Sequence, residues 1–301
     1  MDWIGAAIKV EGARPTGCVI ATIGREKIIQ LQTVAIELQQ GTRLRRQRVR
    51  EVAGLCSWIS SIVPALRPYT AMLWAAASAK CSRQEDSNWI MGARLSLALK
   101  WILAFTKSNL TPVQRRYPMT TVTLGPIVMF DASLTGGGAI LKLPQGSEHV
   151  AVEYLTTWWD EYDHNSVGAA PGESRYQPLW EAYMLLLALV TWQNELLKVI
   201  GNLVVHGDAL GVLQAVVKGK ARNADINIIV AEIQHVLSFG QNDITAAHFW
   251  SEDNAECDAL SRLHEGAEFP SGLAKCMTRP TIRRRPWALL SSEAKVPAKG
   301  R

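Results

Sequence analysis

The stretch VMFDASLTGGGAIL, residues 128–141, carries the strongest fold signal in the sequence. An apolar run ends at Asp131, three successive glycines follow, and a second apolar run begins directly after them. Short apolar runs that are separated by glycine predict neighbouring strands joined by a tight turn. We therefore expect strands over residues 127–131 and 139–143, with Asp131 at the end of the first.

Outward from this hairpin, the sequence predicts a third strand and then alternating helices and strands. The further predicted strands are 150–155, 203–206 and 244–249, and the predicted helices are 179–199, one from 209, 226–238 and 254–263. This order predicts an α/β fold, a mixed five-stranded sheet with flanking helices. The polar segment 156–178 between the third strand and the long helix is predicted to be a loop.

The sequence before the hairpin has a different pattern. After one opening strand, apolar residues at helical spacing predict a mostly helical region over 1–107, with Asp86 and Ser87 capping its last helix. Prolines and arginines over 108–121 indicate a linker. We expect an α/β domain over 122–265, and a basic, disordered tail over 266–301 because of its prolines and arginines.

The formal net charge of +5 hides a strong division along the chain. Residues 1–120 carry a net charge of +10, residues 121–265 carry −11, and residues 266–301 carry +6. Basic ends around an acidic middle indicate basic surfaces that hold a polyanion and carboxylates that hold a cation. Two domains with unrelated surface charge would give the same numbers, so composition leaves both interpretations open.

The composition excludes several classes of protein. With 48% hydrophobic and 20% charged residues, the chain is not wholly disordered, collagen-like or a coiled coil. Its longest uncharged stretches fall short of the roughly 18 residues that a membrane span needs, and no basic-then-apolar signal peptide opens it. The five cysteines form no CxxC pair, so we expect reduced thiols in an intracellular protein, cytoplasmic or nuclear, that does not contact a membrane.

Four carboxylates occupy positions that the predicted elements could bring together. Asp131 and Asp208 end strands, Glu181 lies near the start of the long helix, and Asp258 lies in the last short helix. Clustered carboxylates raise each other's pKa unless cations bind between them. Two Mg²⁺ ions about 3.5–4 Å apart, which Mn²⁺ could replace, would suit such a cluster and also phosphodiester hydrolysis. Each residue alone is as well explained as a turn, cap or solvated residue, so the hypothesis depends on their joint placement.

Four segments, in this order, resemble the ribonuclease H domain of retrotransposon reverse transcriptases of the Ty3/gypsy-like and DIRS-like branch. They are VMFDASLTGGGAIL (128–141), WEAYMLLLAL (180–189), VVHGDALGVLQAV (204–216) and HFWSEDNAECDALSR (248–262). The resemblance implies a ribonuclease H-like fold and cleavage of the RNA strand of RNA/DNA hybrids. It implies that Asp131 bridges two metals, that Asp258 completes the site of the nucleophile-activating metal, and that Glu181 and Asp208 hold the other.

Members of this family often carry a histidine in the loop before the final helix, and this chain has Ser251, Glu252 and Asp253 there. His248 lies earlier, in a predicted strand, and we interpret it as a packed residue outside the site. Two other classes stay open: an inactive nucleic-acid-holding scaffold of the same fold, and a transposase or integrase. The latter would place its glutamate late in the domain, which Glu181 does not do.

By the same resemblance, residues 1–107 are similar to the thumb and connection of a reverse transcriptase, which grip a primer–template duplex. Nucleic-acid contacts are expected from Ser133 and from five clustered arginines: Arg43, Arg45, Arg46, Arg48 and Arg50. A solvated basic helix face is the alternative. No Asp-Asp pair occurs in the sequence, so we expect no polymerase activity from this chain alone. The resemblance implies palm and fingers domains upstream, in a parent polyprotein. The chain would then be a fragment of that polyprotein, the product of a gene model that starts late, or a decayed copy.

Overall fold

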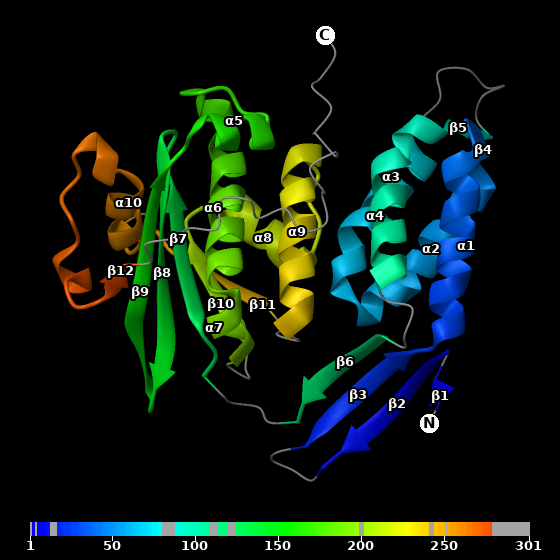
Figure 1. The fold of residues 1–301 in the computed structure, drawn as a ribbon, viewed down its shortest axis with the longest axis horizontal. Helices are drawn as coiled ribbons and strands as arrows, with labels where there is room; N and C mark the ends of the chain where they lie inside the picture. The colour runs from blue at the N-terminus through cyan, green and yellow to red at the C-terminus, as the bar shows by residue number, and fades with distance from the viewer. Residues whose placement is uncertain are drawn as a thin grey trace. The chain divides into compact units, whose positions relative to one another are not determined.

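The computed structural model describes residues 2–3, 5–12, 17–79, 88–108, 113–119, 124–198, 202–240, 244–250 and 252–278. The chain divides into two compact units, an N-terminal unit over Met1–Thr121 and a C-terminal unit over Val122–Arg301. Figure 1 shows the elements of both. Within the described ranges, no helix combines the length and the apolar character that a membrane crossing requires.

The N-terminal unit combines an antiparallel sheet with a group of helices. The sheet has the order β1-β2-β3-β6, with β1 Asp2–Trp3, β2 Ala6–Glu11, β3 Cys18–Ile23 and β6 Val113–Pro118. The helices are α1 Arg25–Gln40, α2 Arg46–Ile62, α3 Arg67–Ser78 and α4 Ser96–Ser108, with 3₁₀ turns at Pro64–Leu66 and Gly92–Arg94. A separate two-stranded ribbon pairs β4 Arg43–Arg45 with β5 Trp89–Met91.

This unit contains more strand than the sequence predicts. Residues 108–121 are not an open linker along their whole length, because β6 pairs with β3 from Val113↔Ile23 to Pro118↔Cys18. The strand is compatible with its proline because Pro118 stands at the strand end, where a missing amide hydrogen costs little. The last helix of the unit begins at Ser96, not near Asp86, which lies outside the described residues.

The C-terminal unit is built on one mixed sheet with the order β11-β10-β7-β8-β9-β12. Its strands are β7 Ile127–Ala132, β8 Gly136–Gln145, β9 Glu148–Trp158, β10 Leu203–Gly207, β11 Ile244–His248 and the short β12 Met277–Thr278. The first three strands run antiparallel, and β10 runs parallel to both β7 and β11. This arrangement confirms the predicted mixed α/β class, a five-stranded ribonuclease H-like sheet that β12 extends.

Helices cover both faces of this sheet. The helices are α5 Glu161–Val167, α6 Gln177–Thr191, α7 Gln193–Lys198, α8 Leu210–Lys218, α9 Ala224–Gly240 and α10 Ala255–Ser261, with 3₁₀ turns at Ser174–Tyr176, Leu263–Glu265 and Ser271–Leu273. Alternation along β7 divides the core: Val128 and Phe130 pack in the cluster that contains α6 and α9, whereas Met129 packs with Leu260 of α10. In Figure 1, α6 and α10 accordingly lie on opposite sides of the sheet.

The three glycines of residues 136–138 serve close packing more than turning. The turn itself is closed by the Ser133 amide, which donates to the Gly136 carbonyl oxygen at 2.7 Å, and the glycines belong to β8. A Cβ atom on Gly137 would collide with Met184 of α6, and one on Gly138 would collide with Leu260 of α10. Glycine thus lets helices approach β8 closely from both faces.

Two further stretches are more ordered than predicted. The segment 156–178 contains α5, whose N-terminus has a capping box in which Asp160 accepts from the Asp163 amide at 2.9 Å and Asp163 accepts from the Asp160 amide at 3.1 Å. In the segment 266–301, the buried Leu273 and the pairing of β12 with β9 fix the chain as far as Thr278, so this part of the predicted tail is structured. Residues 279–301 lie outside the described ranges.

Candidate metal centre

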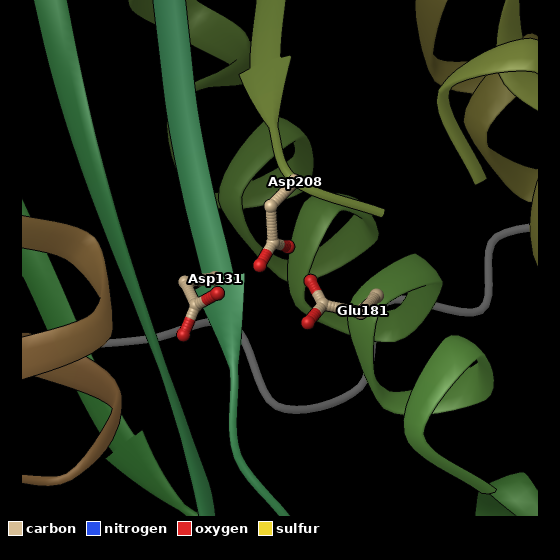
Figure 2. Close-up of side chains that lie close together, drawn as sticks. All are labelled: Asp131, Glu181 and Asp208. Atoms are coloured by element: carbon tan, nitrogen blue, oxygen red, sulfur yellow. The ribbon is translucent and has the colours of Figure 1, made fainter. Parts of the chain in front are cut away.

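Three of the four predicted carboxylates meet at one end of the sheet. Asp131 lies at the end of β7, Asp208 directly follows β10, and Glu181 comes from the beginning of α6. Each contributes an oxygen atom that lies within 4.8 Å of the corresponding atoms of the other two. Figure 2 shows the three carboxyl groups pointing toward one another from these different elements.

Asp131 is held in place and kept from water. Its side chain is part of a residue that is only 4% exposed, and its Oδ2 atom accepts a hydrogen bond from the Ser261 hydroxyl at 3.0 Å. Burial, together with the charges of Asp208 and Asp258, raises the pKa of Asp131 to about 7, although the Ser261 hydrogen bond acts in the opposite direction. Near neutral pH this carboxyl group is therefore poised between its protonated and ionised forms.

Glu181 is buried as deeply, at 3% exposure, and one of its oxygens is oriented by two donors. Oε1 accepts from the Ala132 amide at 3.3 Å and from the Gln177 side-chain amide at 3.1 Å, and Gln177 also donates to the Ala132 carbonyl oxygen. Oε2 is buried and accepts no hydrogen bond from any residue that the structure describes. Burial, followed by the charges of Asp131 and Asp208, raises the pKa of Glu181 well above its ordinary value.

The arrangement fits a cation. A buried carboxylate oxygen without a donor is costly, and three carboxylates in mutual contact repel one another. A hard divalent ion that takes oxygen ligands would remove both penalties. The triad of Asp131, Glu181 and Asp208 could therefore hold a metal ion.

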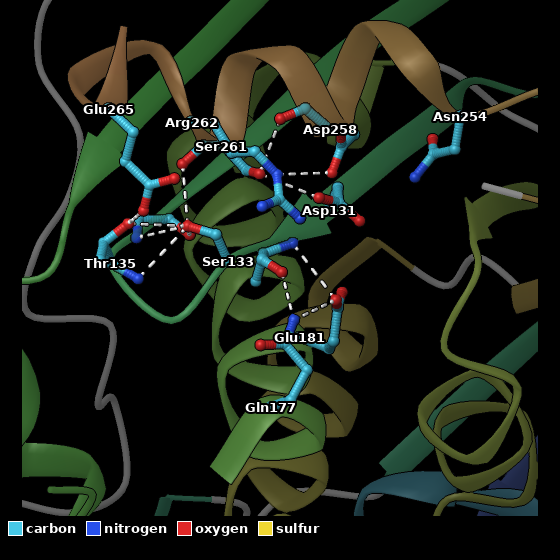
Figure 3. Close-up of polar contacts among 12 residues, drawn as sticks. Asp131, Ser133, Thr135, Gln177, Glu181, Asn254, Asp258, Ser261, Arg262 and Glu265 are labelled. Atoms are coloured by element: carbon cyan, nitrogen blue, oxygen red, sulfur yellow. Dashed lines mark hydrogen bonds and ion pairs between the residues drawn. The ribbon is translucent and has the colours of Figure 1, made fainter. Parts of the chain in front are cut away.

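Asp258, the fourth predicted residue, lies beside this triad but is not among the three mutually close carboxylates of the described residues. It is on α10, close enough for its charge to act on Asp131, and its Oδ1 atom accepts from Nε of Arg262 at 2.9 Å. The Asp258 side chain is 46% exposed, in contrast to the buried Asp131 and Glu181. Figure 3 shows the contacts of Arg262 with Asp258 and of Ser261 with Asp131.

Ser133 faces inward. It is buried, and its hydroxyl oxygen lies 3.2 Å from the Gly136 carbonyl oxygen and 3.1 Å from the Ser261 carbonyl oxygen, to either of which its one proton can donate, while it accepts from the Gly136 amide at 3.0 Å. These bonds close the turn after β7 and connect it to α10 (Figure 3). A direct contact of Ser133 with nucleic acid would require the hydroxyl to leave them.

The five arginines of the N-terminal unit have different environments. Arg46 donates to the carbonyl oxygens of Ala77 and Ala79 at 2.6 and 2.9 Å, at the end of α3. Arg48 forms ion pairs with Glu37 at 2.8 Å and Glu51 at 2.9 Å, and both hydrogen bonds raise its pKa. These two guanidinium groups thus have partners within the fold.

Arg43, Arg45 and Arg50 are exposed. Arg43 and Arg45 stand on the same side of β4, and their guanidinium carbons lie 5.4 and 5.9 Å from the ring centroid of Trp89 on β5. Cation–π contact of this kind restricts the orientation of the two guanidinium groups. The predicted basic cluster is therefore divided into an outward-facing part and a structural part.

Sequence reasoning missed the residues that support the carboxylates. Ser261, Gln177 and Asn254 are ordinary polar residues in sequence, but Ser261 and Gln177 orient triad oxygens, and the Asn254 side chain donates to the Phe130 carbonyl oxygen at 3.0 Å. The position of Gln177 one helical turn before Glu181 was the available signal. Ser261 and Asn254 contact β7 residues that lie more than 120 positions earlier in the chain, so spacing in sequence contains no comparable signal.

No family model and no curated protein matches the chain. Among solved structures, the chain is similar to a foamy viral protease-reverse transcriptase, designated dRH and solved in complex with double-stranded DNA, with a TM-score of 0.27 and 14% sequence identity. That alignment covers 72% of this chain and 34% of the viral chain, so this chain spans about a third of the length of the protein it matches.

Proposed function

We propose that this protein is a metal-dependent endonuclease that hydrolyses the RNA strand of RNA/DNA hybrids as part of a retrotransposon reverse transcriptase. The observation that supports this most strongly is the convergence of Asp131, Glu181 and Asp208 within 4.8 Å, with a buried Glu181 oxygen that lacks a donor among the described residues. Two Mg²⁺ ions, or Mn²⁺ in their place, are the proposed cofactor, and Asp258 is the proposed fourth ligand. In this proposal the chain acts beside upstream palm and fingers, which would supply polymerase activity.

The residues of the site would divide the work as follows. Bound Mg²⁺ would supply Lewis-acid stabilisation of phosphate oxygens and a lowered pKa for a coordinated water. Asp131 and Glu181 would each present one oxygen to the metal. The other oxygen of Asp131 accepts from Ser261, and the other oxygen of Glu181 accepts from the Ala132 amide and from Gln177. Arg262 binds Oδ1 of Asp258 at the edge of the triad, so a metal would take the other oxygen of this carboxylate or displace the ion pair.

The decisive experiment is cleavage of a hybrid with a labelled RNA strand by the purified chain over a range of Mg²⁺ concentrations. Asp131→Asn is expected to lower the rate by roughly a hundredfold or more, equivalent to about 2.7 kcal/mol of barrier. Glu148→Gln is the matched control, because Glu148 is exposed and pairs with Gln145 at the opposite end of the β8–β9 hairpin. A DNA/DNA duplex of the same sequence tests whether the RNA strand is required.

The alternative is a catalytically inactive scaffold that binds nucleic acid. Folded wild-type protein that binds the hybrid without cutting it would support this alternative and contradict the proposal. Equal cleavage by wild type and Asp131→Asn would contradict the assigned residues.

A further inference from the structure

Trp250 is an unusually exposed aromatic side chain beside the carboxylate triad. It is 73% exposed, the largest value among the large hydrophobic residues that the structure describes. An indole ring in water forgoes the stabilisation that burial gives, and an exposed tryptophan next to a polar site offers a ligand a large apolar face.

The backbone around Trp250 is tied to the elements that carry two of the carboxylates. The Phe249 amide donates to the Gly207 carbonyl oxygen at 3.0 Å, directly before Asp208, and the Trp250 carbonyl oxygen accepts from the Asn254 amide at 3.1 Å. Asn254 in turn donates to the Phe130 carbonyl oxygen, directly before Asp131. The position of Trp250 is therefore fixed relative to both β10 and β7.

The ring itself is connected to the site through His248. The two rings meet edge to face with centroids 5.2 Å apart, and Nε2 of His248 lies 3.0 Å from the Asp208 carbonyl oxygen. Only one side chain therefore separates the indole from the residue that presents the Asp208 carboxylate.

We propose that Trp250 packs against the sugar of a nucleotide next to the cut bond, in the minor groove of the hybrid, and positions that strand over the triad. This proposal rests on the proposed function, since it assigns the substrate contact of the same site. A sugar is the expected partner because paired bases hide their faces in a duplex, whereas the wide, shallow minor groove of A-form helices displays sugars and 2′-hydroxyl groups. A nucleotide sugar offers the apolar face that a tryptophan ring packs against, and the indole N–H can donate to its hydroxyl.

The first test is the affinity of the full chain for the hybrid, measured by fluorescence anisotropy in Ca²⁺, which accepts oxygen ligands with less strict geometry than Mg²⁺. Trp250→Ala is expected to weaken binding about tenfold, and Trp250→Phe to stay within about threefold of wild type, because it keeps an aromatic face. The melting temperature of both variants should equal that of wild type, since the side chain is exposed.

Trp158→Ala is the matched control in the same unit. Trp158 is 60% exposed and also meets a histidine, with ring centroids 6.5 Å apart, but β9 lies three strands from β10, the strand that leads to Asp208, about 14 Å across the sheet, whereas β11 is next to β10. The affinity of Trp158→Ala for the hybrid should stay within about twofold of that of wild type. Unchanged affinity of Trp250→Ala, or an equal loss in Trp158→Ala, would overturn the inference.

The second test locates the contact. Single 2′-deoxy substitutions are placed along the RNA strand. At one or two adjacent positions near the cut, they should weaken hybrid binding by wild type but not by Trp250→Ala. Abasic substitutions at the same positions should weaken binding by both proteins equally. If instead the abasic substitutions weaken binding by wild type but not by Trp250→Ala, Trp250 stacks on a base, and the assignment to a sugar is overturned. If wild type binds without cutting and Trp250→Ala still loses affinity, the proposed nuclease activity fails and this inference stands.

Discussion

At the scale of single residues, the buried Glu181 carboxyl group is expected to lower the stability of the fold when no cation is bound. Replacing Glu181 by glutamine keeps an acceptor for the Ala132 amide and removes a buried carboxyl group that, when ionised, repels Asp131 and Asp208. In EDTA we expect Glu181→Gln to raise the melting temperature by a few degrees, roughly 1–2 kcal/mol, because breaking up like charges in a buried site is stabilising. Thermal unfolding with and without Mg²⁺ measures this, with Glu148→Gln as the control.

In Mg²⁺, wild type should have a higher melting temperature than Glu181→Gln, the reverse of the order in EDTA. Wild type should gain stability from bound ions, by an amount that grows with their concentration, whereas Glu181→Gln should gain little. A variant that is less stable than wild type in EDTA would show that the carboxylate is needed for packing and not for a cation.

The titration of Asp131 gives a prediction with a definite sign. Its pKa in the folded protein is about 7, above the ordinary value of 3.8, so between these pH values the folded chain binds a proton that the unfolded chain has lost. Metal-free stability must then fall as the pH rises through this window. We expect the melting temperature in EDTA to fall by roughly 5 °C between pH 5 and pH 8, and less in Asp131→Asn. A dependence that is equal in wild type and variant would contradict the assignment to Asp131.

At the same scale, the sequence predicts the charged residues of the site better than their neighbours. Asp131, Glu181 and Asp208 stand at strand ends and in a helical turn, where local periodicity alone gives their position. Ser261 is 130 residues from the Asp131 oxygen that it binds, and only the packing of α10 on the sheet brings the two together. Asp258 was placed on the correct helix, but its pairing with Arg262 depends on side-chain geometry that no pattern specifies.

At the scale of elements, we expect the exposed arginines of the β4–β5 ribbon to contact phosphate, whereas Arg46 and Arg48 have partners within the fold. Changing Arg43 and Arg45 to glutamine together should make the dependence of log affinity on log salt less steep. The magnitude of its negative slope should fall by about 1.8, since each phosphate contact contributes about 0.9. Arg48→Gln should leave the slope unchanged, because that guanidinium is paired with Glu37 and Glu51. Hybrid binding at several salt concentrations measures both, and equal slopes for all three proteins would contradict the division.

The segment after α10 gives a second prediction at this scale. Leu273 is 1% exposed, lies four residues before the start of β12, and packs with Met129, Ile140, Cys257 and Leu260. Leu273→Ala should therefore lower the free energy of unfolding by about 2–4 kcal/mol, measured by urea denaturation. The control is Lys275→Ala, because Lys275 is exposed and should change stability little. A cost below about 0.5 kcal/mol would show that this segment is not part of the core.

The same elements show where sequence patterns suffice. Strands β7 to β11 were predicted within a few residues, because each is a short apolar run bounded by polar or glycine residues. The sequence does not predict β3, β4, β5, β6 or β12. Strands β4, β5 and β12 have only two or three residues, too few for alternation to show a period, and β6 has the polar residues Gln114, Arg115 and Arg116 at its centre. The partners of β4, β5, β6 and β12 lie far away in the sequence. Strand pairing of this kind is a tertiary property.

At the scale of the whole molecule, the division of charge predicts that divalent cations strengthen binding of the proposed hybrid substrate. The acidic middle of the chain, with −11 over residues 121–265, repels a phosphate backbone, whereas residues 1–120 carry +10. Cations bound at the triad would convert part of the acidic surface into a phosphate site. Affinity for the hybrid should therefore depend on divalent ions beyond their effect on ionic strength.

The test compares Ca²⁺ with Na⁺ at matched ionic strength, using anisotropy of a labelled hybrid. Wild type is expected to bind roughly tenfold more tightly in Ca²⁺, a difference of about 1.4 kcal/mol. A variant with Asp131→Asn, Glu181→Gln and Asp208→Asn should lose this dependence and should bind more tightly than wild type when only Na⁺ is present, because three repelling charges are gone. If the variant keeps the full response to Ca²⁺, the ions act elsewhere on the chain, and the triad is not the site that joins this acidic unit to nucleic acid.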